Sequence, residues 1–254
     1  MTILLVRHAE SEGNVDHKIF LDKADHALHL SPKGEEQARA LGLFLKDYYA
    51  ANPPKKNIRL WCSPYQRTLS TLKGMRETMG EWVWNKCGRG RDVHFDDRLR
   101  ERHWGFHQPH EYQPGGSVEK QNPHLFKHFR TTRDTPMGRY FAQPFGGESA
   151  ADTVSRLHSF FHDLHFDIQR GVTDHIIVTH ALTMMAFVYG FTKLHPQFFD
   201  DEVLADNTGV RLLDIDPETG RYADYGYIYN PSTNVYLTQK PARPVQRDLE
   251  SLWR

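Results

Sequence analysis

The chain opens with TILLVRH at positions 2–8, a run of branched apolar side chains directly before an arginine and a histidine. A short apolar run without alternation predicts a strand that is buried on both faces, as in a parallel sheet. The runs at 58–62 and 176–179 have the same character. Residues 210–215 predict a fourth strand, which a turn at 216–220 would close.

Helix-starting signals lie between these predicted strands. The Ser-Pro pairs at 31–32 and 63–64 combine a capping hydroxyl with proline at the first helical position. Ser149 and Asp152 form a capping box, and an apolar stripe at helical spacing follows them. Strands alternating with helices predict an α/β fold of three α/β/α layers with a mostly parallel central sheet.

Residues 105–147 interrupt this alternation, because they are dense in histidine, proline, glycine and aromatic residues and show no clear period. A long segment without predicted structure inside a domain is usually functional, and many such segments are lids. We therefore expect one domain over residues 1–238, with a lid insertion at about 105–147. Residues 239–254 begin with QKPARP and predict an extended C-terminal tail.

Charge and composition argue against several classes of protein. Lysine plus arginine equals aspartate plus glutamate at 32 each, and a net charge of zero argues against a nucleic-acid partner. No stretch approaches the roughly 20 apolar residues of a membrane span, so no membrane partner is expected. Cys62 and Cys87 are too few for a disulfide framework, which favours a reducing, cytoplasmic location.

The 16 histidines raise the question of metal binding. Three pairs have the i,i+4 spacing that can place two ligands on one helix face: His103/His107, His124/His128 and His158/His162. None of these pairs encloses the glutamate of the zincin motif, and such pairs arise by chance at this histidine content. We therefore expect no metal.

Three chemically distinctive segments each follow a predicted strand. They are Arg7-His8, Ser63 to Arg67, and His180. Because ligands of open α/β sheets bind at the carboxyl ends of the strands, we expect these segments to line one pocket. Two arginines, two histidines and a helix N-terminus at Ser63 would suit a phosphate group.

These segments belong to a longer ordered set. The set is LVRHAES at 5–11 with Asn14, LSPKG at 30–34, SPYQRT at 63–68, LRERHWG at 99–105, GES at 147–149 and VTH at 178–180. Together they resemble the histidine phosphatase superfamily, in its branch 1, which is phosphoglycerate mutase-like. The resemblance covers the chain from the N-terminus to about residue 215, and the shared order of the segments makes it specific.

The resemblance implies a role for each matching residue. His8 would be the nucleophile that forms a phosphohistidine, and Glu101 would be the general acid that protonates the leaving oxygen. The groups that bind or flank the phosphoryl oxygens would be Arg7, Asn14, Arg67 and His180. The chemistry agrees, because flanking cations favour a neutral histidine and a nearby phosphate dianion favours a protonated glutamate.

Two departures from other members of the superfamily bear on the substrate. Ala181 follows His180 where some of these phosphatases carry an aspartate as proton donor, so Glu101 must serve. Trp104 stands where phosphoglycerate mutases have tyrosine, and Tyr112 stands where they have a basic residue that binds the substrate carboxylate. We expect Ala181 and Trp104 to contact the substrate.

These differences favour a phosphatase of small-molecule phosphomonoesters, with a small phosphorylated substrate as partner and no cofactor. Segments 145–149 and 178–183 also look more like broad-range phosphatases of the superfamily. One alternative is a mutase-type phosphotransferase that would depend on 2,3-bisphosphoglycerate. Another is a protein that binds a phosphorylated ligand without catalysis. A homodimer also remains open.

Overall fold

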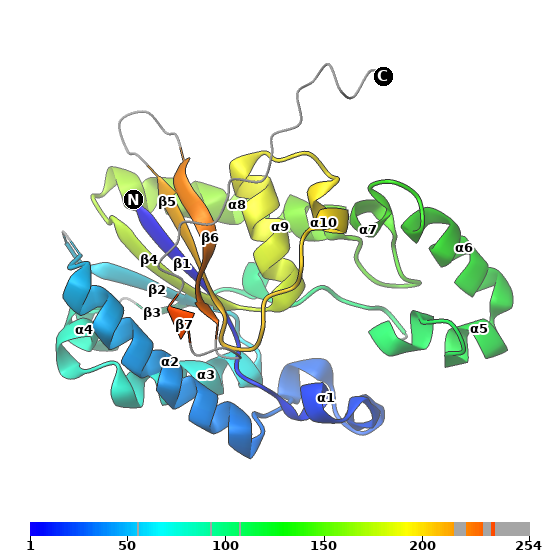
Figure 1. The fold of residues 1–254 in the computed structure, drawn as a ribbon, viewed down its shortest axis with the longest axis horizontal. Coiled ribbons are helices and arrows are strands. Elements are labelled where there is room, and N and C mark those ends of the chain that lie inside the picture. Colours follow the sequence, from blue (N-terminus) through cyan, green and yellow to red (C-terminus); the bar gives the residue numbers. More distant parts are fainter. Residues whose placement is uncertain (55, 92, 107, 216–221, 231–234, 237–254) are drawn as a thin grey trace.

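The computed structural model describes the chain except at residues 55, 92, 107, 216–221, 231–234 and 237–254. The described strands form one seven-stranded mixed sheet in the order β3-β2-β4-β1-β5-β6-β7 (Figure 1). They are β1 (Thr2–Arg7), β2 (Ile58–Cys62), β3 (Val93–Phe95), β4 (Asp174–Thr179), β5 (Val210–Ile215), β6 (Tyr222–Asn230) and β7 (Val235–Tyr236). Strands β3, β2, β4 and β1 are parallel neighbours, and β5, β6 and β7 add antiparallel pairs.

All four strands expected from the sequence form, and the predicted α/β fold with a mostly parallel central sheet is confirmed. β1 lies in the middle of the sheet, where Leu5 pairs with Ile177 on one side and Arg211 on the other. The sequence analysis did not anticipate β3, β6 and β7. Two of these, β3 and β7, have only three and two residues, too few to show a period.

Helices cover both faces of the sheet (Figure 1). One face carries α2 (Pro32–Ala51), α3 (Gln66–Thr78) and α4 (Glu81–Lys86), and the other carries α8 (Ala150–Gln169) and α9 (Ala181–Thr192). Successive side chains of β1 point to opposite faces, so each face receives its own apolar residues. Leu4 and Val6 pack with the first group of helices, and Ile3 and Leu5 pack with the second.

Shorter helical segments complete the described part of the chain. They are α1 (Glu12–Val15), η1 (His17–Leu21), η2 (Asp25–Ala27), η3 (Gly88–Gly90), η4 (Asp97–Leu99), η5 (Pro109–Tyr112), α5 (Ser117–Gln121), α6 (Pro123–Arg133), α7 (Gly138–Phe141) and α10 (Phe198–Asp201). Both α1 and η2 precede α2, and η4 leads into the segment that contains Glu101.

The insertion at 105–147 is helical, which corrects the prediction of a stretch without regular structure. It contains α5, α6 and α7, and these helices close over a small apolar core of its own formed by Tyr112, Val118, Phe129 and Ala142. Two of its helices, α5 and α7, have only five and four residues, too few for a hydrophobic period, whereas α6 has 11 residues. The two ends of the insertion meet at its base, where the Phe106 N–H donates to the Phe145 carbonyl (3.3 Å). Whether the insertion acts as a lid stays a prediction.

Two of the three predicted helix starts are confirmed, and one is wrong. Ser31 caps α2 through Gly34 N–H, and Ser149 caps α8 within a capping box. The pair at 63–64 starts no helix, because α3 begins at Gln66 with Tyr65 as its N-terminal cap. The Ser63 hydroxyl instead contacts His180.

Some sequence predictions fall outside the described residues. These are the turn at 216–220, the tail at 239–254 and the last residues of the expected domain 1–238. Among the helices of the described part, none has both the length and the apolar character needed to cross a membrane.

Candidate active site

The carboxyl ends of the parallel strands bring the predicted catalytic groups together. Arg7 ends β1, where it pairs with Thr179 at the end of β4, and His8 and His180 follow these two residues. The His8 and His180 rings lie edge to face with their centroids 5.1 Å apart. Both histidines are buried at the carboxyl ends of β1 and β4.

His8 is held as a neutral imidazole with a defined tautomer. Its Nδ1 lies 2.7 Å from the main-chain carbonyl of Ala9, which can only accept, so Nδ1 must carry the proton. Burial, with the charges of Arg67 and Arg7, holds the pKa of His8 well below its ordinary value. The neutral ring therefore has an unprotonated Nε2, which is the atom required for nucleophilic attack.

The two arginines approach this histidine from different elements. Arg7 donates through Nη1 to the carbonyl of Ala205 (2.5 Å), and burial lowers the pKa of its guanidinium. Arg67 comes from the first turn of α3, is 4% exposed, and lies over the Tyr65 ring at 4.9 Å. A half-buried guanidinium group and a buried one beside a neutral histidine create a site that attracts anions.

His180 has Ser63 as its partner, a residue that the sequence predicted to be a helix cap. The Ser63 hydroxyl lies 2.9 Å from Nε2 of His180, and the Tyr65 ring meets His180 edge to face at 5.0 Å. Nδ1 of His180 has no partner among the described residues. Burial, Arg67 and His8 hold the pKa of His180 well below its ordinary value, so this ring is neutral as well.

Glu101 reaches the same site from the segment after η4. Its carboxylate lies at the N-terminus of α9, where Oε2 is 3.4 Å from Leu182 N and Oε1 is 3.3 Å from Thr183 N. The Arg102 N–H donates to Oε1 at 2.8 Å. Glu101 also interacts electrostatically with Arg7, which places the carboxyl group near the predicted phosphoryl site.

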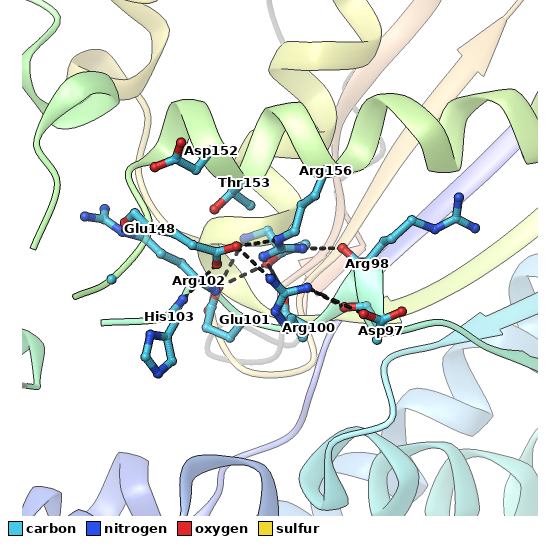
Figure 2. Close-up of polar contacts among 12 residues, drawn as sticks. Asp97, Arg98, Arg100, Glu101, Arg102, His103, Glu148, Asp152, Thr153 and Arg156 are labelled. Atoms are coloured by element: carbon cyan, nitrogen blue, oxygen red, sulfur yellow. Dashed lines mark hydrogen bonds and ion pairs between the residues drawn. The ribbon is translucent and has the colours of Figure 1, made fainter. Parts of the chain in front are cut away.

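A network of charged groups fixes the segment that carries Glu101 (Figure 2). Glu148 accepts from Arg100 Nη2 at 2.8 Å, from Arg156 Nε at 3.1 Å and from the His103 N–H at 3.0 Å. Arg156 also donates to the Arg100 carbonyl at 2.8 Å. The charged run around Glu101 is therefore tied to α8 and is not a solvated turn.

Asn14 lies beside the catalytic segment but is exposed. Its Oδ1 accepts from the Ser11 N–H at 3.0 Å and lies 3.2 Å from Asn207 Nδ2. Asn207 Nδ2 also lies 3.1 Å from the His8 carbonyl, so Asn207 links Asn14 to the backbone of His8. No sequence signal pointed to Asn207, because it follows none of the recognised motifs.

Trp104 and Ala181 occupy different settings. Trp104 is half-buried, with the Arg102 guanidinium 4.4 Å above its ring and Tyr112 at 6.2 Å, so it packs at the base of the insertion. Ala181 is the first residue of α9 and is 7% exposed directly after His180. Ala181 thus adjoins the site, whereas Trp104 packs against the insertion.

The described residues contain no group of three or more histidine, cysteine, aspartate or glutamate side chains arranged to hold a metal ion. The pair His158/His162 lies on α8, and the pair His124/His128 lies on α6. His107 belongs to the residues whose structure is not described.

Comparisons with known proteins identify the family of this chain. Residues 3–227 match the family model of the histidine phosphatase superfamily (branch 1). The phosphoglycerate mutase-like protein AT74 of Arabidopsis thaliana is 29% identical over 233 residues, which cover 88% of this chain and 66% of AT74, just under two thirds of its length. The broad-range acid phosphatase DET1 of Saccharomyces cerevisiae is 24% identical over 87% of both chains.

Solved structures show the same fold. A mycobacterial glucosyl-3-phosphoglycerate phosphatase, solved with VO3, has a TM-score of 0.61 at 18% identity and covers 90% of this chain and 98% of its own. The α-ribazole phosphatase of Shigella flexneri has a TM-score of 0.61 at 19% identity, with coverage of 87% and 95%.

Proposed function

The chain belongs to branch 1 of the histidine phosphatase superfamily, and from this premise we propose that it hydrolyses small-molecule phosphomonoesters through a phosphohistidine on His8. The observation that carries the proposal is the state of His8. Its Nδ1 proton is engaged by the Ala9 carbonyl, its ring lies 5.1 Å from the neutral His180 ring, and it interacts with the charges of Arg67 and Arg7. This is a nucleophile within a preformed anion site.

In the first step, Nε2 of His8 attacks phosphorus, and the bond between phosphorus and the leaving oxygen breaks. Glu101 gives its proton to that oxygen, so the alcohol leaves neutral. Arg7 and Arg67 neutralise charge on the transferring phosphoryl group without moving, because other contacts already hold both side chains.

In the second step, water attacks the phosphohistidine, and the carboxylate of Glu101 accepts a proton from that water. The bond between phosphorus and Nε2 breaks, inorganic phosphate leaves, and Glu101 is protonated again for the next turnover. The net reaction consumes one water for each ester, and the enzyme returns to its starting state.

The names of two relatives suggest two activities to test, hydrolysis and mutase activity. DET1 is named a broad-range acid phosphatase, and AT74 is named only as phosphoglycerate mutase-like. We favour the phosphatase, because Tyr112 stands where mutases have their carboxylate-binding cation and is 1% exposed, with its hydroxyl accepting from the Phe145 N–H. A buried tyrosine so engaged offers no positive charge to a phosphoglycerate.

The test is a panel of phosphomonoesters assayed for release of inorganic phosphate, beside mutase activity with and without 2,3-bisphosphoglycerate. Turnover is quenched without acid, and the phosphorylated peptide is located by mass spectrometry. We expect phosphate release and a label on the His8 peptide, both absent in His8→Ala and both retained in His124→Ala, which alters an exposed histidine of α6. Transfer between 2- and 3-phosphoglycerate without net release would identify a mutase, and binding without turnover would identify a non-catalytic protein.

A further inference from the structure

Asn207 lies in the segment between α10 and β5 and contacts two residues of the proposed site. Its Nδ2 lies 3.1 Å from the main-chain carbonyl of His8 and 3.2 Å from Oδ1 of Asn14. The first contact sets the orientation of the Asn207 amide, because a carbonyl can only accept and must therefore face the nitrogen. The two protons of Nδ2 thus match two acceptors, one on the main chain of the nucleophile and one on Asn14.

The amide of Asn14 has a defined orientation as well. Its Oδ1 accepts from the Ser11 N–H at 3.0 Å, from the Ser11 hydroxyl at 3.1 Å and from Nδ2 of Asn207. A flipped amide would set its own N–H protons against these donors. Nδ2 of Asn14 has no partner within the part of the chain that the structure describes, and Asn14 is exposed. Both protons of this Nδ2 are therefore available to a ligand.

The two residues that hold Oδ1 of Asn14 relate it to different parts of the molecule. Ser11 belongs to the same turn as Asn14, so its two contacts tie the amide only to the start of α1. Asn207 donates to Asn14 and also to the carbonyl of His8, from which it is 199 residues distant in the chain. Asn207 thus sets the position of the Asn14 amide relative to the nucleophile.

The turn that carries Asn207 is strained and is shaped around the same backbone. Thr208 has a left-handed backbone (φ 58°), which is rare for a β-branched residue. This conformation brings the Thr208 N–H to the His8 carbonyl at 3.3 Å, beside Nδ2 of Asn207. The next carbonyl, that of Gly209, accepts from the Arg7 N–H at 3.1 Å. Strained residues of this kind cluster at functional sites, where the surrounding contacts hold them in place.

We propose that Asn207 is a positioning residue for phosphoryl binding, because it holds the Asn14 amide beside His8 with Nδ2 of Asn14 turned to the phosphoryl oxygens. The inference rests on the proposed function, in which His8 takes the phosphoryl group and Asn14 lies beside its oxygens. Nδ2 of Asn14 adds a neutral donor to the charged donors of Arg7 and Arg67. A donor that is held in advance stabilises charge on the transferring group without having to move during the reaction.

The test is a double-mutant cycle of Asn207→Ala and Asn14→Ala, since the coupling between them separates an action through Asn14 from an independent effect. Each variant is assayed on glycerol phosphate and on p-nitrophenyl phosphate, which carry the same phosphoryl group. Val203→Ala is the matched control, because Val203 lies in the same segment and is 76% exposed. If Asn207→Ala does not fold, Asn207→Ser replaces it, with a side chain too short to reach both acceptors.

We expect each single variant to lower kcat/KM by about tenfold on both substrates, because a hydrogen bond to a charged group is worth about that factor. The double variant should also lie about tenfold below wild type, and not at the loss of about a hundredfold that independent effects would give. Val203→Ala should stay within about twofold of wild type. A loss of about a hundredfold in the double variant, or an Asn207→Ala enzyme within about twofold of wild type, would overturn the proposal.

Binding of inorganic phosphate, measured by calorimetric titration, separates this inference from the proposed function because it needs no turnover. Asn207→Ala should raise the Kd of phosphate by about fivefold in the wild-type background and leave it unchanged in the Asn14→Ala background. An unchanged Kd in Asn207→Ala would overturn the role of Asn207 even in an active phosphatase. A raised Kd that depends on Asn14, in a protein that hydrolyses no ester, would support the role of Asn207 and refute the phosphatase.

Discussion

Arg67 Nη1 lies 2.8 Å from Oδ1 of Asp25 and 2.6 Å from the main-chain carbonyl of the same residue. The proposed phosphoryl-binding arginine is thus held by a residue of the segment between β1 and α2. Both protons of Nη1 are engaged, so the donors left for substrate are Nε–H and the two Nη2 protons. Nη2 makes only a long contact to Oδ2 of Asp25, at 3.4 Å. Asp25 therefore determines which edge of Arg67 faces the phosphoryl group.

Asp25→Ala should lower kcat/KM by about tenfold on every phosphomonoester, because a guanidinium held only by the main-chain carbonyl of residue 25 spends less time in the productive orientation. Asp25→Asn keeps an oxygen that accepts from Nη1, and its activity should stay within about threefold of wild type. Steady-state kinetics of both variants decide the point. An unchanged kcat/KM in Asp25→Ala would mean that the main-chain carbonyl of residue 25, α3 and Tyr65 are enough to position Arg67.

The roles of Glu101 and Arg67 can be separated with two substrates. Glu101→Gln keeps the size of the side chain but cannot deliver a proton, so the rate should fall roughly 10²–10⁴-fold on alkyl phosphates and much less on p-nitrophenyl phosphate. Arg67→Ala removes charge-assisted hydrogen bonds to the phosphoryl group and should lower kcat/KM at least about tenfold on both. If Glu101→Gln impaired both substrates equally, Glu101 would bind phosphate and the acid would lie elsewhere.

Stability should decline in acid, because buried histidines resist protonation. Burial, Arg59 and the N-terminus lower the pKa of His175 to about 3, and neither of its ring nitrogens has a partner among the described residues. The unfolded chain titrates near pH 6.5, so it binds the extra proton below that pH and the native state does not. The stability contributed by neutral His175 is thus full above about pH 6.5 and falls by up to about 1.4 kcal/mol per unit as pH drops toward 3.

His175→Leu removes this proton uptake and tests the argument. The free energy of unfolding of the variant, minus that of wild type, should be about 2 kcal/mol larger at pH 5 than at pH 7.5. Urea unfolding at both pH values measures this difference. His124→Leu, at an exposed position of α6, should change stability by less than about 0.5 kcal/mol at either pH. Parallel stability curves for wild type and His175→Leu would show that His175 takes up its proton in the native state.

We expect the insertion to set substrate preference, and Trp104, which packs at the base of the insertion, to hold it in position. Trp104→Ala removes the ring between Arg102 and Tyr112, which should loosen the insertion while leaving His8 in place. Ratios of kcat/KM among substrates should change by more than about fivefold, and p-nitrophenyl phosphate should still phosphorylate His8. Trp82→Ala, at a 47% exposed position of α4, should leave the ratios unchanged. A uniform loss of activity in Trp104→Ala would restrict Trp104 to packing.

The sequence predicted correctly those features that depend on residues close together in the chain. The apolar run of β1 depends on burial of each residue, and the caps at Ser31 and Ser149 depend on a hydroxyl and an N–H three residues apart. The insertion escaped prediction because α5 and α7 have only five and four residues and because the small core that stabilises it is gathered from positions 112 to 142. Propensity alone cannot reveal such a core.

The sequence by itself determined the α/β fold and the approach of His8, Arg7 and His180, because parallel strands deliver the residues that follow them to one edge of the sheet. Only the tertiary structure decided the partners of these groups. Ser63 meets His180, Asp25 holds Arg67, and Thr183 meets Glu101. The members of these pairs lie 42 to 117 residues apart. Their contacts depend on the paths of loops between elements, and those paths follow from packing of the whole chain and leave no periodic trace in the sequence.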